Sequence, residues 1–208
     1  MDRYYEACDK AISAMNKENV EAFGRLKLAD WDQVNVIRTV VTVYRTSMRK
    51  ARKRYLKVAR YGYLYGMYLC GLGKDQRAAE KAITEKWVDR VLTETDFVTL
   101  YRFNSEAERK AYKLAETLEV SPDRNREIDK ALRYWSQQLG QFAINMTDYA
   151  ILQAFEDAGV EEVIWDTVKD ERRCHECREL DGKRLKVDEV PPKPHIGCRC
   201  HLIPVVDE

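Results

Sequence analysis

A long stretch in which apolar side chains recur every three or four residues constrains the fold of this chain more than any other feature. It covers residues 34–72 and is interrupted only at Gly62. The pattern predicts a single helix over about residues 31–72, with a narrow apolar seam like that of a coiled coil. Such a helix would be roughly 55–60 Å long at 1.5 Å per residue, so we expect a helix from later in the chain to lie along it.

The end of this stretch combines glycines with aromatic side chains. Gly62 and Gly66 are four residues apart, a spacing that lets two helices approach closely. The tyrosines around them could instead form a platform on which nucleic-acid bases stack. We favour helix packing, because the apolar seam runs through the same positions. The tyrosines are Tyr61, Tyr63, Tyr65 and Tyr68.

A second long helix is predicted over residues 122–158. Ser121 and Pro122 are typical of a helix start, with Ser121 as the N-cap and Pro122 at the first helical position, where its missing N–H is not needed. Gly159 stands where a residue of left-handed conformation would end the helix. We expect this helix to be the partner of the first one.

Shorter elements are predicted between the two long helices. An amphipathic helix fits residues 78–92, and another fits residues 104–119 with Asn104 or Ser105 as its N-cap. Residues 93–103 contain β-branched and aromatic side chains that suit a strand as well as a helix. Both interpretations of that segment stay open.

The pattern changes to short segments after Gly159. Residues 163–168 and 184–187 alternate as strands do, and Asp181-Gly182 is a tight-turn pair between them. Residues 190–194 form a stiff, proline-rich connector. A segment this short, with so few large apolar side chains, buries too little surface to fold unaided, so we expect a staple.

Two clusters of metal-binding residue types supply that staple. Cys174 and Cys177 form a Cys-x-x-Cys pair, and His195, Cys198 and Cys200 follow after a loop of hairpin length. Thiolate and imidazole groups suit zinc, and two such clusters can complete a tetrahedral site. The sequence therefore predicts a structural zinc ion held by residues from this set, whose binding would help the segment to fold.

The cluster offers five donors for four coordination positions. Either or both of Cys198 and Cys200 could reach the metal, because alternate residues of an extended segment share a face, and His175 and His201 lie nearby in the sequence. Among the five donors, Cys174 and Cys177 are the two that we most expect to be ligands. The alternatives are free thiols or a redox Cys-x-x-Cys, which we disfavour because redox motifs normally lie at a strand-to-helix junction. A catalytic zinc would need an open coordination position.

The segments together predict an α+β fold that is mostly α, with an elongated helical domain over residues 1–158 and a small, zinc-stapled β module over residues 159–208. Charges nearly balance, with 36 Lys and Arg against 35 Asp and Glu, which disfavours a globally basic nucleic-acid binder. The longest nearly uncharged apolar run, residues 61–73, is shorter than the roughly 20 residues that span a bilayer. We expect a soluble, cytoplasmically made protein. No phosphate-binding loop, carboxylate pair or nucleophile elbow indicates an enzyme.

The C-terminal residues resemble the signature of the phage Mu F-like minor head proteins, the head morphogenesis proteins of tailed phages. The resemblance covers roughly residues 140–204, and Thr147-Asp148 stands where many members carry Thr-Glu. It implies a low-copy virion component at the portal vertex and capsid interior, acting in head assembly or in DNA packaging and delivery. The implied partners are the portal protein and the major capsid protein, with packaged DNA as a further one, and no membrane or small-molecule substrate. The residues that carry the resemblance are Gly159-Val160, Trp165-Asp166-Thr167, Asp170, Cys174-x-x-Cys177, Leu180-Asp181-Gly182, Pro191-Pro192, His195 and Cys198-Arg199-Cys200.

Positive charge is concentrated in the first long helix. Residues 31–70 contain nine basic residues and one acidic residue, in a chain of almost zero net charge. These side chains could contact DNA phosphates or an acidic partner, or they could form a solvated face offset by acidic helices of the same bundle. The first interpretation leads to an alternative function, a sequence-independent nucleic-acid-binding zinc protein. The candidate binding residues are Arg45, Arg49, Lys50, Arg52, Lys53, Arg54, Lys57 and Arg60.

Overall fold

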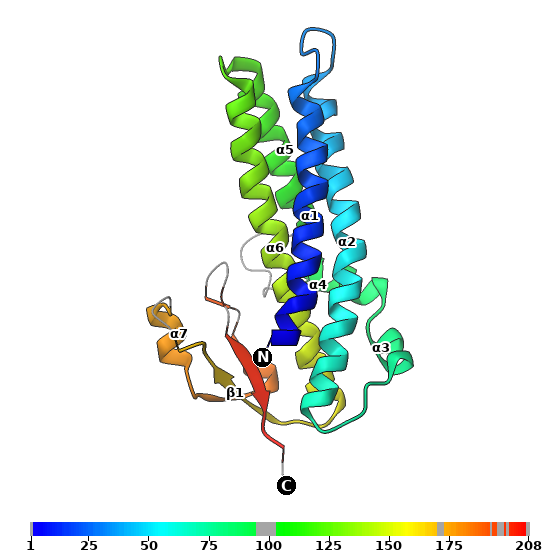
Figure 1. Cartoon of the computed structure of the whole chain (residues 1–208), viewed down its shortest axis with the longest axis vertical. Helices are drawn as coiled ribbons and strands as arrows, with labels where there is room; N and C mark the ends of the chain where they lie inside the picture. The colour runs from blue at the N-terminus through cyan, green and yellow to red at the C-terminus, as the bar shows by residue number, and fades with distance from the viewer. Residues whose placement is uncertain are drawn as a thin grey trace.

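Four long helices form an elongated bundle with a small sheet at one end (Figure 1). The computed structural model describes residues 2–94, 103–169, 173–191, 193–194, 198 and 200–206. The long helices are α1 (Asp2–Lys27), α2 (Val36–Leu69), α5 (Phe103–Val120) and α6 (Arg124–Asp157). The short helices α3 (Gln76–Ala82) and α4 (Glu85–Glu94) lie beside the half of α2 that is nearer the sheet.

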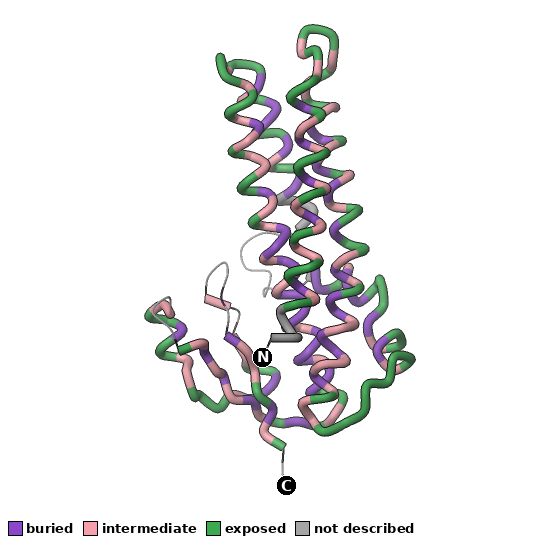
Figure 2. Tube along the Cα trace, viewed as in Figure 1, coloured by how far each residue is buried: buried purple, intermediate pink, exposed green. Residues whose placement is uncertain are grey.

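Helix α2 is the long helix predicted from the apolar spacing. It begins after Asn35, whose side chain accepts a hydrogen bond from the Arg38 N–H at 2.8 Å and so caps the helix later than residue 31. It ends at Leu69, and Gly71 follows with a φ of 74°. Helix α6 packs along α2, as expected, so the seam is buried between helices (Figure 2).

The predicted start of α6 is wrong by two residues. Asp123, not Ser121, is the N-cap, and its carboxylate accepts a hydrogen bond from the Arg126 N–H at 3.0 Å. Pro122 therefore precedes the cap instead of occupying the first helical position. The Ser121 hydroxyl accepts from the Asp123 N–H at 3.2 Å and turns the chain ahead of the helix. At the other end Gly159 has a φ of 75°, which confirms the predicted left-handed termination.

The single helix predicted over residues 78–92 is two helices, α3 and α4. The helix is interrupted at Ile83, whose side chain is fully buried and whose carbonyl accepts a hydrogen bond from Arg60 Nε at 3.0 Å. The Thr84 hydroxyl then accepts from the Trp87 N–H at 3.2 Å and starts α4. Helix α5 begins at Phe103, before both caps proposed from the sequence, Asn104 and Ser105. Most of the undecided segment 93–103 lies outside the described residues.

The glycines of α2 stand where that helix touches α6. A Cβ on Gly62 would lie 2.7 Å from the carbonyl oxygen of Thr147, and one on Gly66 would lie 2.7 Å from Ala154 Cβ. Such contacts are too short for any side chain, so these positions set the distance between the helices. Close packing of helices is thus the role of the glycine pair, as the sequence indicated.

We expect Gly62→Ala to lower the free energy of unfolding by about 1–3 kcal/mol, because the added methyl meets backbone that cannot move alone. Gly24→Ala in α1 is the matched control, since nothing lies within 4 Å of its added Cβ. It should be neutral or stabilising by about 0.5–1 kcal/mol. Urea unfolding followed by circular dichroism measures both. Equal effects of the two substitutions would contradict the close contact.

The C-terminal sheet has three antiparallel strands in the order β2-β1-β3. Strand β1 (Glu162–Asp166) lies in the centre, between β2 (Arg184–Lys186) and β3 (His201–Pro204). Strands β1 and β2 correspond to the predicted strands, whereas β3 was not predicted from the sequence. Alternate residues Val163 and Trp165 of β1 are buried, and they divide the module into two apolar clusters.

These two clusters attach the sheet to the bundle and build the site. The first joins Phe155 at the end of α6 to Val163 of β1 and Val187. The second surrounds Trp165 and contains three cysteines. The fold is thus mostly helical with a small C-terminal sheet, as predicted. Among the helices described, none combines the length and the hydropathy that crossing a bilayer requires.

Candidate metal centre

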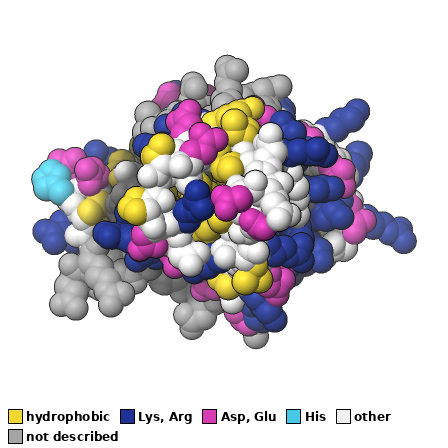
Figure 3. Space-filling view, turned by 90° about the horizontal axis from the view of Figure 1, so that it is seen from above, with side chains coloured by type: hydrophobic (Ala, Val, Ile, Leu, Met, Phe, Trp, Pro, Cys, Tyr) yellow, Lys and Arg dark blue, Asp and Glu magenta, His cyan; other side chains and the backbone are white. Residues whose placement is uncertain are grey.

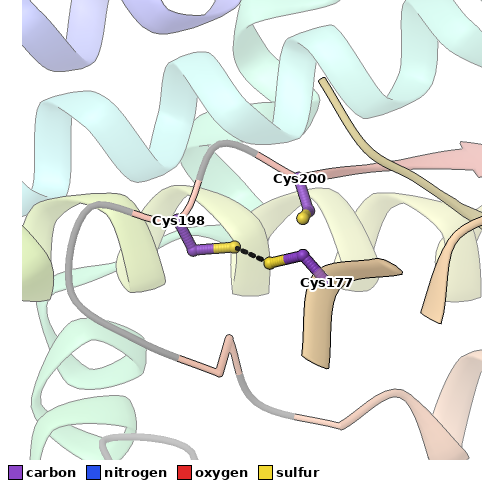
Figure 4. Close-up of side chains that lie close together, drawn as sticks. All are labelled: Cys177, Cys198 and Cys200. Carbon is purple, nitrogen blue, oxygen red and sulfur yellow. Dashed lines mark hydrogen bonds between the residues drawn. The ribbon is translucent and has the colours of Figure 1, made fainter. Parts of the chain in front are cut away.

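Three buried cysteine sulfurs converge beside the sheet (Figure 4). Cys177 comes from the short helix α7 (His175–Leu180), whereas Cys198 and Cys200 come from the chain just before β3. The three Sγ atoms lie within 4.8 Å of one another, and Cys177 Sγ is 3.7 Å from Cys198 Sγ. The structure therefore brings together cysteines from both sequence clusters.

Cys174 lies next to this group without belonging to it. Its sulfur caps α7 by accepting a hydrogen bond from the Cys177 N–H at 3.3 Å, and its half-buried side chain packs against the same apolar cluster. Cys174 thus lies near the three sulfurs and packs against the cluster that contains them. His195, the fifth predicted donor, lies outside the described residues.

The two other histidines have different surroundings. The His175 side chain is 81% exposed, and its Nδ1 is 3.6 Å from a carboxylate oxygen of Glu179. His201 Nε2 lies 2.9 Å from Asp166 Oδ2 across the β1–β3 pair. Neither belongs to the group of three sulfurs. Cys8, which is buried, and Cys70 are also free thiols in the described structure, far along the chain from the cluster.

Pairing of β1 with β3 explains why Cys200 reaches the site. The register places Asp166 opposite His201, so the residue before His201 lies beside the end of β1. Asp181 joins Thr167, just after β1, to Arg173, just before α7, since its carboxylate accepts from the Thr167 hydroxyl at 2.8 Å and from Arg173 Nη1 at 2.8 Å. These contacts tie α7 to β1, and Cys177 packs in the same apolar cluster as Trp165.

Burial controls the protonation of the metal-free sulfurs. Desolvation raises the pKa of the Cys177 thiol to about 12. The hydrogen bond between the Cys198 and Cys200 side chains raises the pKa of Cys198 and lowers that of Cys200, and interaction with the Trp165 indole also lowers the pKa of Cys200. A metal ion bound here would have to displace the protons of these thiols.

The geometry fits zinc. With Zn–S bonds of about 2.3 Å, the sulfurs of a tetrahedral site are about 3.8 Å apart, close to the separation of Cys177 and Cys198. A disulfide would need about 2.05 Å. The buried cysteines are thus compatible with a zinc site.

One reason for disfavouring a redox motif does not hold. The Cys-x-x-Cys begins helix α7, with Cys174 as its N-cap, and this is a place where redox pairs also occur. What distinguishes the site is the presence of two more sulfurs, those of Cys198 and Cys200, within reach of Cys177. A redox pair does not need them, whereas a tetrahedral metal site does.

A buried ion pair that the sequence analysis missed lies beside the sulfurs. Lys193 Nζ is 3.0 Å from Asp148 Oδ2, and these side chains are only 6% and 7% exposed. Lys193 Nζ also donates a hydrogen bond to the carbonyl of Cys200. The pair therefore ties the segment that carries the cysteines to helix α6. The sequence does contain a signal for this pair: Asp148 is a charged residue within the apolar stripe of α6, and a buried acid needs a partner.

The family model of phage Mu protein F like proteins matches residues 73–203, which run from α3 to β3 and include both cysteine clusters. The chain belongs to this family. No curated protein and no solved structure matches it. Membership supports a role in phage head morphogenesis as a virion component, in a family that is structural rather than catalytic. The match reaches further toward the N-terminus than the signature noticed in the sequence, and α1 and α2 precede it.

In this Mu F-like protein, half of the candidate binding residues of α2 serve the bundle itself. Arg45 pairs with Glu108 at 3.3 Å, Arg52 with Asp89, and Arg54 with Glu18, while Arg60 donates to the carbonyl of Ile83. Three of these four cations thus face carboxylates of neighbouring helices, and Arg60 is held by a backbone carbonyl. The other four are exposed and form no ion pair within the described part of the chain: Arg49, Lys50, Lys53 and Lys57.

Proposed function

We propose that this protein is a minor head protein of a tailed phage, present in few copies at the portal vertex and in the head interior. It would bind the portal protein and the major capsid protein and act in head assembly or in DNA packaging and delivery. The observation that carries the proposal is the family match over residues 73–203. The elongated bundle supports it, because long helix faces are suited to binding other proteins.

We further propose that the cysteine cluster holds a structural zinc ion. Cys177, Cys198 and Cys200 would be ligands, and Cys174 or His195 would supply the fourth donor. Four protein donors leave no open coordination position, so the ion would stabilise the module and would not catalyse a reaction. This role explains how a three-stranded sheet with two small apolar clusters holds together.

Co-purification tests the proposed function. The chain is expressed together with the portal protein of its phage, and the mass and zinc content of any complex are measured. We expect a complex of defined mass that withstands physiological salt, because apolar helix faces contribute to such interfaces. The same experiment is carried out with the major capsid protein. The proposal is contradicted if the chain forms no complex with the portal protein and none with the major capsid protein.

The nucleic-acid alternative draws less support from the structure. Four of its eight candidate residues are paired within the bundle, so fewer phosphates could be neutralised than the sequence suggested. Its own test is the affinity for duplex DNA at two salt concentrations. Binding that falls steeply between low and physiological salt, in the absence of a portal complex, would favour this alternative.

A further inference from the structure

Three exposed cations form a stripe along α2. Arg49, Lys53 and Lys57 are four residues apart, so their Cα atoms follow one another at about 6 Å along one side of the helix. Within the described residues none of the three forms an ion pair, unlike Arg52 and Arg60 beside them. In the view along the bundle, Lys and Arg side chains gather on the side where α2 lies (Figure 3).

The stripe is one wall of a groove between α2 and α4. The groove has a volume of about 450 Å³, and its opposite wall carries Glu85 and Asp89 of α4. A narrow apolar strip lies between the charged walls and consists of Leu56, which is half-buried, and Val88, which is 2% exposed. It thus combines an apolar strip with a row of cations on one side.

The charges on the two walls are unequal. Arg52 pairs with Asp89 across the groove, and Arg60 is held by the Ile83 carbonyl, with Glu80 at 4.0 Å. These contacts join α2 to the segment of α3 and α4. The cations of the stripe remain in excess over the carboxylates, so the groove favours a ligand whose negative charge faces α2.

We propose that this groove binds an acidic amphipathic helix of a partner protein. An apolar side chain of that helix would contact Leu56, the more exposed of the two apolar residues, and its carboxylates, one turn apart, would pair with Arg49, Lys53 and Lys57. A helix matches the roughly 6 Å repeat of the stripe, because its own residues four apart have the same spacing. The proposal does not rest on the proposed function.

DNA fits the groove less well. The carboxylates of Glu85 and Asp89 on the α4 wall would repel phosphates, and the apolar strip offers a phosphate backbone no contact. A charged helix face meeting DNA has no need of a groove with apolar side chains, whereas binding of an amphipathic helix uses both.

The test uses the full chain and a labelled peptide of about 14 residues, with Leu on one face and Glu on the flanks of that face. Binding is followed by fluorescence anisotropy, next to a basic peptide of the same apolar pattern and a DNA duplex. The groove variant carries Arg49→Glu, Lys53→Glu and Lys57→Glu. The matched control carries Lys17→Glu, Lys50→Glu and Lys113→Glu, which are exposed, do not line the groove and change the net charge equally.

We expect the acidic peptide to bind, and its Kd to rise at least about tenfold in the groove variant, because attraction becomes repulsion at three positions. The control variant should change the Kd by less than about threefold. Circular dichroism checks that both variants remain folded. Failure of the acidic peptide to bind, equal losses in the two variants, or a preference for the basic peptide would overturn the proposal. So would DNA that binds more tightly than the peptide and is released by the groove substitutions.

Discussion

Replacing Asp148 by Ala is expected to lower the free energy of unfolding by about 3–5 kcal/mol. The substitution leaves the ammonium group of Lys193, which is 6% exposed, buried without its carboxylate. Because Lys193 also holds the Cys200 carbonyl, the loss should loosen the segment that carries Cys198 and Cys200. Urea unfolding, followed by circular dichroism and by tryptophan fluorescence, measures the effect.

Two further variants separate the buried pair from a general effect of removing charge. Replacing Asp148 and Lys193 together by Leu should restore much of the stability, since no unpaired charge remains in the interior. Glu189→Ala breaks the exposed pair with Lys186, whose side chains are 61% and 66% exposed, and should change the stability by less than about 1 kcal/mol. If Asp148→Ala has no larger effect than Glu189→Ala, then Lys193 is not confined beside α6 in solution.

Removing zinc with a chelator, or substituting Cys177 and Cys198 by Ser, is expected to unfold the C-terminal module while the helical bundle persists. Structural zinc sites contribute on the order of 10–16 kcal/mol of apparent binding energy, more than a small sheet can lose and stay folded. The bundle has its own core, which includes Tyr55 and Trp135. Amide hydrogen exchange should therefore quicken in β1 and β3 and change little in α2.

Cys70→Ser is the control, because Cys70 is half-buried at the end of α2 and does not belong to the sulfur group. Its zinc content should match that of the unsubstituted chain. Zinc that remains bound at one equivalent after the double substitution would refute the site. Loss of the helical signal along with the sheet would refute the independence of the bundle.

The zinc affinity should also depend on pH. The pKa of Cys177 is raised to about 12 and that of Cys198 is raised as well, so both are thiols below pH 8 without metal. Each thiol that must lose its proton weakens binding by up to about tenfold for every unit by which the pH falls. Zinc titration with a competing chelator between pH 6 and pH 8 measures the slope. An affinity that does not change with pH would contradict thiolate ligation.

Much of the architecture follows from local patterns. The spacing of apolar residues determines α2, because a helical period is a property of neighbouring residues. Gly159 ends α6 for the same kind of reason, since its left-handed backbone requires a residue without a side chain. The start of α6 was predicted wrongly because two possible N-caps, Ser121 and Asp123, lie within three residues of each other, and either can cap a helix.

The candidate site was half visible in the sequence. Residue chemistry and spacing identify five candidate metal donors in the sequence: Cys174, Cys177, His195, Cys198 and Cys200. Which of the sulfurs converge depends on the pairing of β1 with β3, and strand pairing joins residues far apart in the chain. Strand β3 itself is too short to show an alternating pattern of its own.

The sequence by itself determined the two long helices, the change of pattern after Gly159 and the residue types of the candidate metal centre, because each depends on neighbours along the chain. Only the tertiary structure decided that Lys193 meets Asp148 in the interior and that Arg52 is neutralised by Asp89 while Lys53 is not. The physical reason is that the environment of a charge is set by what packs against it, and these partners come from other helices and loops.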